Sequence, residues 1–157
     1  MRKKLLLLTT LIFTAVSGAW AENVLYGIMN GTQLTLYCGD NKELPEDAIE
    51  YSKRWGNYSW SSYEVEYATS IVTDASCSNY NGTSTYRMFS DFSSVTSIDL
   101  RNLNTSNITN MSCMFASCYE LTNITFGSHS NTSNVTDMSY MFYGCSGLTS
   151  LNLSNFN

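Results

Sequence analysis

Two hydrophobic periods alternate along the second half of the chain. Within Thr96–Leu100, Ile98 and Leu100 alternate with polar residues, which predicts a short, half-buried strand. Thr122–Phe126 and Thr149–Leu153 repeat this pattern. After each polar Asn/Ser/Thr loop, apolar residues fall at i, i+3, i+4 and i+7, the spacing of one helix face. These residues are Met111, Met114, Phe115 and Cys118 in one segment, and Met138, Met141, Phe142 and Cys145 in the next.

The two periods belong to one repeating unit. Asn104–Cys118 and Asn131–Cys145 are identical at ten of fifteen positions, at a spacing of 27 residues. A weaker strand pattern lies upstream, around Ile71. A repeat of this length predicts a solenoid in which each unit buries its apolar face against the next. We therefore expect an α/β repeat fold, a leucine-rich-repeat solenoid with short parallel strands and short helices, over residues 68–157. It would hold about four units, the last incomplete.

Residues 22–67 are expected to form an N-terminal cap on this array. Val24–Met29 and Thr32–Cys38 flank Asn30-Gly31, a two-residue signal for a type I′ hairpin turn. Such a turn pairs Met29 with Thr32, Gly27 with Leu34, and Leu25 with Leu36. The three leucines then share one face of the hairpin, which we expect to be the inner one.

The rest of the cap is acidic and aromatic. Pro45–Trp55 begins with acidic residues and ends with Lys53-Arg54, which predicts a short helix. The alternation of Tyr63, Val65 and Tyr67 predicts a strand. The aromatic residues of this stretch either cover the exposed end of the array or form a contact site for carbohydrate or protein. They are Trp55, Tyr58, Trp60, Tyr63 and Tyr67.

The N-terminus has the organisation of a secretory signal peptide. Arg2, Lys3 and Lys4 precede the apolar stretch Leu5–Val16, and Ala19-Trp20-Ala21 is a small-x-small cleavage site. Residues 1–21 are therefore predicted to be a signal peptide removed after Ala21, and the protein is predicted to be secreted or held at the cell surface. No second long apolar run follows, so no membrane span is expected after cleavage.

Charge restricts the partners of the mature chain. Removing the three basic residues of the signal from the eight Lys and Arg leaves five against thirteen Asp and Glu, a net charge of −8. Nucleic acid and anionic membranes are therefore poor partners. Most of the acidic residues lie in the cap, so the repeats present a nearly neutral Ser, Thr and Asn surface. The outward strand positions form the candidate binding face: Ser97, Asp99, Arg101, Asn123, Thr125, Ser150 and Asn152.

Five cysteines follow the signal, and export permits disulfides. The odd number leaves at least one thiol unpaired or intermolecular. Cys38 with Cys77 is one candidate bridge. Cys118 and Cys145 occupy equivalent repeat positions, where they either fill the core or, if their strands stack closely, form a disulfide. Cys113 is expected to point away from the core and to be the exposed, reactive thiol.

The sequence contains no arrangement that indicates catalysis. His129 is the only histidine and lies in the polar loop Gly127–Ser130, so any His-dependent nucleophile would have to use it. The cysteines lack zinc-type pair spacing, and no nucleophile-elbow or phosphate-binding glycine motif occurs. We predict neither enzymatic activity nor a metal or cofactor.

The string SNVTDMSYMFYGCSGLTSLNLSNFN at the C-terminal end resembles the BspA-like leucine-rich-repeat surface proteins of bacteria. The resemblance covers roughly Thr69–Asn157. It implies a surface protein that adheres to host extracellular matrix proteins or to other cells. It carries no binding residue over to this chain.

Two classes of function remain, a binding module and a structural protein. The leading hypothesis is an adhesin that contacts a protein through its repeat surface. The alternatives are a surface or biofilm component that associates with itself through the apolar edge Leu151–Phe156, and a fragment of a longer adhesin. The Asn-x-Ser/Thr triplets could accept glycans, but the side chains more plausibly satisfy main-chain groups in tight loops.

Overall fold

A computed structural model of the chain describes residues 24–39, 47–54, 57–60, 65 and 67–156. The predicted signal peptide, residues 1–21, lies outside the described residues. Across the described ranges, no helix is long and apolar enough to cross a membrane.

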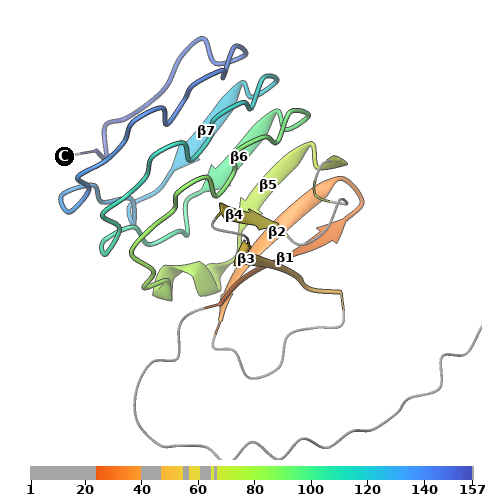
Figure 1. The fold of residues 1–157 in the computed structure, drawn as a ribbon, viewed down its shortest axis with the longest axis horizontal. Coiled ribbons are helices and arrows are strands. Elements are labelled where there is room, and N and C mark those ends of the chain that lie inside the picture. The colour runs from red at the N-terminus through yellow and green to blue at the C-terminus, as the bar shows by residue number, and fades with distance from the viewer. Residues whose placement is uncertain (1–23, 40–46, 55–56, 61–64, 66, 157) are drawn as a thin grey trace, which may run out of the picture.

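The described strands form one mixed sheet in the order β4-β3-β1-β2-β5-β6-β7 (Figure 1). The pairs β1–β2, β1–β3 and β3–β4 are antiparallel, whereas β2, β5, β6 and β7 run parallel to one another. A short 3-10 helix, η2, follows β5. The bounds are β1 Val24–Asn30, β2 Gln33–Gly39, β3 Ile49–Arg54, β4 Asn57–Trp60, β5 Ser70–Thr73, η2 Ala75–Asn79, β6 Ser97–Leu100 and β7 Asn123–Phe126.

The parallel strands confirm three of the four strand positions expected in the repeats. Ile71 pairs with Ile98, and Ile98 pairs with Ile124, so the chain returns to the same place after 27 and 26 residues. The strand expected at Thr149–Leu153 is not formed. This segment has a neighbouring strand on one side only, and Leu153 stays 39% exposed, so little burial stabilises an extended conformation there.

The helices expected at 111–118 and 138–145 are absent, and this prediction was wrong. Tandem turns replace them, with left-handed φ angles of 56° at Cys113, 64° at Ser117, 57° at Tyr140 and 76° at Gly144. A left-handed residue every fourth position is incompatible with a right-handed helix. We call residues 84–92, 110–118 and 137–145 the turn layer, which lies opposite β5, β6 and β7 in Figure 1.

Main-chain bonds explain why the turn layer is not helical. Alternate N–H groups close turns to the carbonyl three residues back, as Met114 does to Met111. The N–H groups between them leave the segment and reach the next unit, as Phe115 does to the Met141 carbonyl at 2.9 Å. The helical spacing of the apolar residues was still a correct guide to burial, because Met111, Met114 and Cys118 are all buried. The leucine-rich-repeat class itself stays a prediction.

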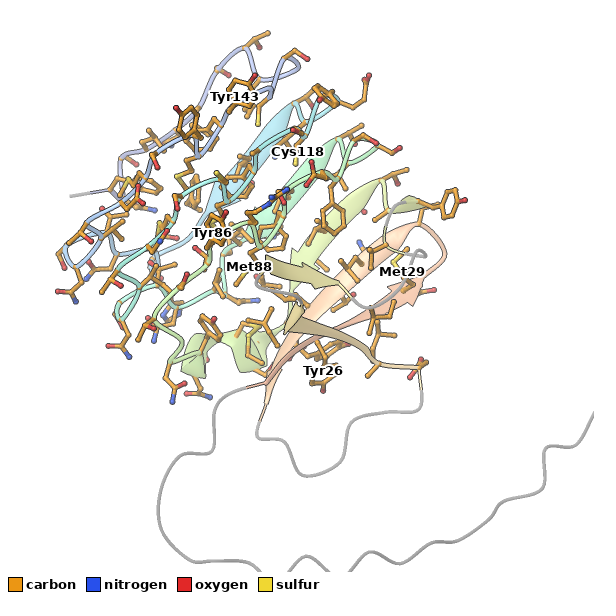
Figure 2. The ribbon with its side chains drawn as sticks, viewed as in Figure 1. Tyr26, Met29, Tyr86, Met88, Cys118 and Tyr143 are labelled. Carbon is orange, nitrogen blue, oxygen red and sulfur yellow. A yellow bond between two sulfur atoms is a disulfide. The ribbon has the colours of Figure 1, made fainter. Side chains whose placement is uncertain are left out.

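The core between the two layers is built from repeated side chains. Phe115 stacks on Phe89 with ring centroids 5.8 Å apart and on Phe142 at 5.5 Å, and we call these three rings the phenylalanine stack. Met88 and Met114 beside them are almost completely buried. Figure 2 shows the side chains of the described residues as sticks, with Met88 and Cys118 of this core labelled.

The N-terminal hairpin is confirmed, but its register differs from the expected one by two residues. Asn30 pairs with Gln33, so the loop is Gly31-Thr32 rather than Asn30-Gly31. Gly31 has a φ of 61°, whereas Thr32 is not among the residues with positive φ, which indicates a type II′ turn with glycine first. A shift of two keeps every side chain on its expected face, so Leu25, Leu34 and Leu36 still share the buried face, although Leu25 now pairs with Cys38.

Two further predictions in the cap were wrong. Within Pro45–Trp55, the expected helix is replaced by β3, because the free edge of β1 offers pairing partners: Leu25 pairs with Tyr51. Val65 and Tyr67 do not form a strand, since Val65 accepts a turn bond from the Ala68 N–H and is buried while Tyr67 is exposed. The side chains of Trp55, Tyr58, Trp60 and Tyr63 lie outside the described residues.

The cap and the repeats are joined by main-chain pairing and by a disulfide. Gln33 and Leu34 of β2 pair with Ser70 and Ile71 of β5, so the hairpin continues the parallel sheet of the repeats. Cys38 at the end of β2 is bonded to Cys77 in η2, with the Cα atoms 4.7 Å apart. The candidate Cys38–Cys77 disulfide is therefore present in the structure.

We expect Phe115→Ala to destabilise the protein by about 3–5 kcal/mol, the usual cost of emptying a buried aromatic site. Phe142→Ala should cost clearly less, because Phe142 is half-buried and stacks on one neighbour only. Urea unfolding followed by circular dichroism would measure both. Equal losses for the two variants would show that the phenylalanine stack does not determine stability.

Candidate functional site

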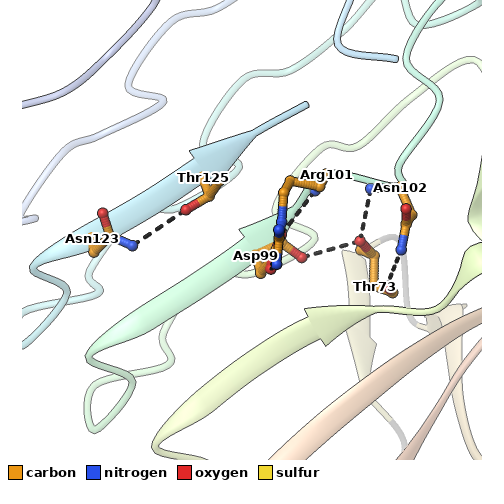
Figure 3. Close-up of polar contacts among 6 residues, drawn as sticks. All are labelled: Thr73, Asp99, Arg101, Asn102, Asn123 and Thr125. Atoms are coloured by element: carbon orange, nitrogen blue, oxygen red, sulfur yellow. Dashed lines mark hydrogen bonds and ion pairs between the residues drawn. The ribbon is translucent and has the colours of Figure 1, made fainter. Parts of the chain in front are cut away.

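The outward face of the parallel strands carries polar side chains in two rows. Ser97 on β6 pairs with Asn123 on β7, and Asp99 pairs with Thr125. Ile98 and Ile124, which lie between them in sequence, are buried on the opposite face. The alternation of side chains along the strands therefore places four of the predicted binding residues side by side in register, with Asn123 exposed and the others half-buried. Figure 3 shows three of them, Asp99, Asn123 and Thr125.

A ladder of threonines sets the entry of each strand into this face. Thr96 donates to the Thr69 carbonyl through its N–H at 2.9 Å and through its hydroxyl at 3.1 Å. Thr122 donates to the Thr96 carbonyl in the same way, at 2.9 and 3.0 Å. Because both the main chain and the side chain are held, the polar rows cannot slip past each other without breaking four bonds.

Asp99 and Arg101 form the charged centre of the face. The Arg101 Nε donates to the Asp99 carboxylate at 3.0 and 2.9 Å, and the Arg101 N–H donates to it at 3.0 Å. These bonds hold the pKa of Asp99 below its ordinary value of 3.8, and the side-chain bond from Arg101 contributes most to this lowering. The Arg101 side chain is 67% exposed, so the pair presents its guanidinium to solvent.

The backbone next to this pair is fixed from both sides. Asn102 donates its side-chain amide to the Thr73 carbonyl at 2.8 Å, and Thr73 donates its hydroxyl to the Asp99 carbonyl at 3.0 Å (Figure 3). On the other side Gly127 approaches so closely that a Cβ atom there would lie 2.6 Å from the Arg101 Cα. The charged pair is therefore preorganised, which lowers the entropy cost of binding a ligand.

The other predicted residues lie elsewhere. Ser150 and Asn152 are exposed, but no strand forms around them; the Asn152 side chain accepts a local bond from the Ser154 N–H at 3.0 Å. The outward positions instead continue in the opposite direction: the row of Ser97 continues to the polar Ser70, and the row of Asp99 continues to the apolar Val72 on β5. Both rows go on to β2, at Gln33 and Thr35. The Thr69-Ser70-Ile71 match to Thr96-Ser97-Ile98 was the sequence signal for this extension.

The loops beside the face use Asx residues as internal acceptors. Asn104 accepts from the Ser106 N–H at 3.0 Å, and Asn131 accepts from the Ser133 N–H at 2.8 Å. The side chain of Asn134, within one of the glycan-acceptor triplets, donates to the Ser106 carbonyl at 2.7 Å. These contacts support the reading that such side chains satisfy main-chain groups.

One cavity between the strands and the turn layer is too small to hold a small molecule. A cavity of about 10 Å³ lies between Leu100, Met111 and Phe126, enough for roughly one water. Ligand pockets are usually ~300 Å³ or larger. Within the described ranges, no group of three His, Cys, Asp or Glu side chains converges on a point. The polar strand face is therefore a better candidate site than this cavity.

The free thiols differ in environment. Cys118 is buried and donates to the Phe89 carbonyl at 2.9 Å, and burial raises its pKa to about 12. Cys145 is half-buried, donates to the Phe115 carbonyl at 3.0 Å, and also has a raised pKa because of burial. Cys113 is partly exposed, less fully than expected, and His129 is an exposed loop residue.

We expect a thiol reagent at pH 8 to modify Cys113 of the folded protein before Cys118 and Cys145. The thiolate is the reactive form, and burial keeps the other two thiols protonated. Timed labelling followed by peptide mass mapping would give the order. If Cys118 were modified before Cys113, the burial of Cys118 and the partial exposure of Cys113 would both be contradicted.

We expect Arg101→Gln to raise the pKa of Asp99 towards 3.8. In the native protein the lowered pKa means that the pair stabilises the fold above about pH 3.8, and that this contribution is lost as the pH falls through the lowered value. Carboxyl ¹³C NMR titration would measure both proteins. An unchanged Asp99 titration would show that the guanidinium is not its main partner in solution.

One comparison with known proteins finds a match. Residues 83–157, just under half of the chain, match the family model described as "Mycoplasma protein of unknown function, DUF285". The match begins at Thr83, next to the first residue of the turn layer. No curated protein and no solved structure matches the chain. The repeated half of this chain, with its polar strand face, is thus similar to a family whose function is unknown.

Proposed function

We propose that this chain is an exported surface protein that binds another protein through the outward face of its parallel strands, as an adhesin does. The observation that carries the proposal is the preorganised Asp99–Arg101 pair between two registered rows of small polar side chains. Arginine presented by a rigid backbone is a frequent anchor in protein interfaces. Side chains on strands are also placed more reproducibly than side chains on loops.

Two further observations support this class of function. The sequence resembles BspA-like surface proteins, and the matched family model is found in such proteins. The predicted leader Met1–Ala21 would export the chain. The partner we infer is a protein of host extracellular matrix or of another cell. A mature net charge of −8 argues against polyanions.

A self-associating surface component is the second candidate, and one observation favours it. Leu153 is 39% exposed and Leu151 is half-buried. Phe156 lies close to them in sequence, and the centroid of its ring is 4.9 Å from that of Phe126. An apolar edge of this kind favours association between copies. Such association would depend on protein concentration and would not require the Asp99–Arg101 pair.

The test is a double charge exchange, Asp99→Lys with Arg101→Glu. The exchange keeps an ion pair on the strand face but reverses the charge that it presents. We expect capture of the protein's ligand on matrix-coated surfaces or whole cells to fall at least tenfold, while the unfolding midpoint falls only slightly, since an ion pair with one exposed partner contributes little to stability.

The matched control is Arg87→Asp with Asp91→Arg. This pair is also exposed and bonded at 2.8 Å, but it lies in the turn layer. It should leave capture unchanged. If the strand-face exchange leaves capture unchanged as well, the binding site lies elsewhere. Self-association that survives the strand-face exchange but is lost in Leu153→Lys, with capture unchanged, would favour the structural candidate.

A further inference from the structure

The outward face of the sheet continues from the repeats onto the N-terminal hairpin, where its character changes from polar to aromatic. Leu36 and Cys38 of β2 are buried, so Tyr37 between them lies on the opposite, outward face and is half-buried. Tyr37 pairs with Tyr26 of β1, which is also half-buried and is labelled in Figure 2. The face that carries Asp99 therefore has an aromatic part that lies in the cap.

The rings of Tyr26 and Tyr37 stack on each other. Their centroids are 5.3 Å apart, and their planes differ by 13°. This separation is close to the spacing of neighbouring strands, about 4.8 Å, so the stack runs across the sheet rather than along a strand. Because Tyr26 covers one face of the Tyr37 ring from the side of β1, the other face of that ring is turned towards β5.

Asp74 occupies the neighbouring position on the β5 side. Its backbone is extended, and its N–H donates to the Leu36 carbonyl at 2.8 Å, which continues the pairing of Leu36 with Thr73. Asp74 is therefore next to Tyr37, and strand alternation places it on the outward face, since Thr73 is buried. Burial first, then Tyr37 and Asp74, raise the pKa of Tyr26, as expected for a carboxylate near the stack.

The negative charge of Asp74 is not neutralised. A bond of 2.9 Å from the Ser76 N–H is the main reason that its pKa is lowered, so the carboxylate is ionised at neutral pH. In the part of the chain that the structure describes, no Lys, Arg or His side chain is bonded to it. By register its neighbour is Arg101, which is held by Asp99. Two carboxylates and one guanidinium leave one negative charge here.

We propose that the position between Tyr37 and Asp74 binds an arginine side chain of the partner protein. The inference rests on the proposed function, because it concerns the same strand face. A planar guanidinium can lie on the ring face of Tyr37 that Tyr26 does not cover, as a third layer of the stack. From there it can donate two parallel N–H bonds to the Asp74 carboxylate. A lysine ammonium supplies the charge but not this planar fit.

The place of this position in the sheet favours another protein as the source of the arginine. It lies between β2 and β5, and β6 and β7 separate it from the C-terminal side of the array. A further repeat unit stacked after β7 would therefore not cover it. A second copy is a poor source, because two chains of net charge −5 repel each other and the exposed Arg101 is already paired with Asp99.

The first probe is a five-residue peptide, a single arginine between two pairs of glycines, with both ends blocked. Its control carries citrulline, which has nearly the same shape as arginine but no charge. Added at millimolar concentration to the full chain, the arginine peptide should shift the ring resonances of Tyr26 and Tyr37 in NMR spectra. The ring of Tyr119, which is 53% exposed outside the sheet, should not shift. The citrulline peptide should shift none of the three.

A matched pair of variants isolates the charge. Asp74→Asn keeps an acceptor for the Ser76 N–H, since asparagine caps as well as aspartate does, but it removes the carboxylate. We expect it to bind the arginine peptide about threefold more weakly, the usual effect of losing an exposed ion pair. Asp137→Asn is the control, because Asp137 accepts an equivalent bond from the Ser139 N–H at 2.8 Å but lies in the turn layer. It should bind the peptide unchanged.

The ring is tested by Tyr37→Val, which keeps a residue suited to a strand but removes the aromatic face. Binding of the arginine peptide should fall about threefold, as expected for an exposed cation–π contact. Circular dichroism of all three variants would show that a weaker affinity does not reflect unfolding.

Four outcomes would overturn the proposal. They are equal shifts from the arginine and citrulline peptides, unchanged binding by Asp74→Asn, stronger ring shifts from a neutral trisaccharide such as maltotriose, and ring shifts when the protein alone is concentrated. The last two would make a carbohydrate or a second copy the occupant.

Capture of the protein's ligand separates this inference from the proposed function. If Asp74→Asn leaves capture intact while the exchange at Asp99 and Arg101 abolishes it, the strand face binds a protein without this arginine contact. If the exchange leaves capture intact while the arginine peptide still shifts both rings, the proposed function fails and the arginine site stands.

Discussion

Hydrogen bonds between residues 25–28 positions apart hold this protein together, and every other feature of the repeats depends on them. They join strand to strand on one side and turn segment to turn segment on the other. A main-chain group that is buried must find a partner, and here the partner is the next unit. No unit can therefore satisfy its own main chain, so each unit depends on the neighbours on either side of it.

Side chains reinforce this dependence because the same residue type recurs at the same place. Phe115 lies between two phenylalanines, and Thr96 lies between Thr69 and Thr122. Each position thus contributes one contact to the unit before it and one to the unit after it. The inner positions supply these stacking contacts, whereas the outward strand positions Ser97, Asn123 and Thr125 remain at the surface, beside the Asp99–Arg101 pair.

The array also has two different ends. At one end the hairpin continues the sheet, and the Cys38–Cys77 bond fastens it to the first unit. In the third turn segment the N–H groups in the corresponding register have no acceptor among the described residues, because the peptide groups of the turn layer are aligned in the same direction. This asymmetry follows from the tandem turns and would not arise in a layer of helices, where the same groups bond within one segment.

The sequence by itself determined the repeat length, the strand positions at Ile71, Ile98 and Ile124, and the buried face of residues 111–118; in the next unit only Met141 of the four expected residues is buried, and Met138 is 37% exposed. It also placed Ser97, Asp99, Asn123 and Thr125 on one face, because strand alternation is a local property. Only the tertiary structure decided that Met111–Cys118 forms turns, since its N–H partners lie in another unit. It likewise set the hairpin register, the absence of a strand around Leu151, and the conversion of Ile49–Arg54 to a strand. Each of these depends on which main-chain groups a neighbouring segment offers, and spacing along a single segment carries no information about that.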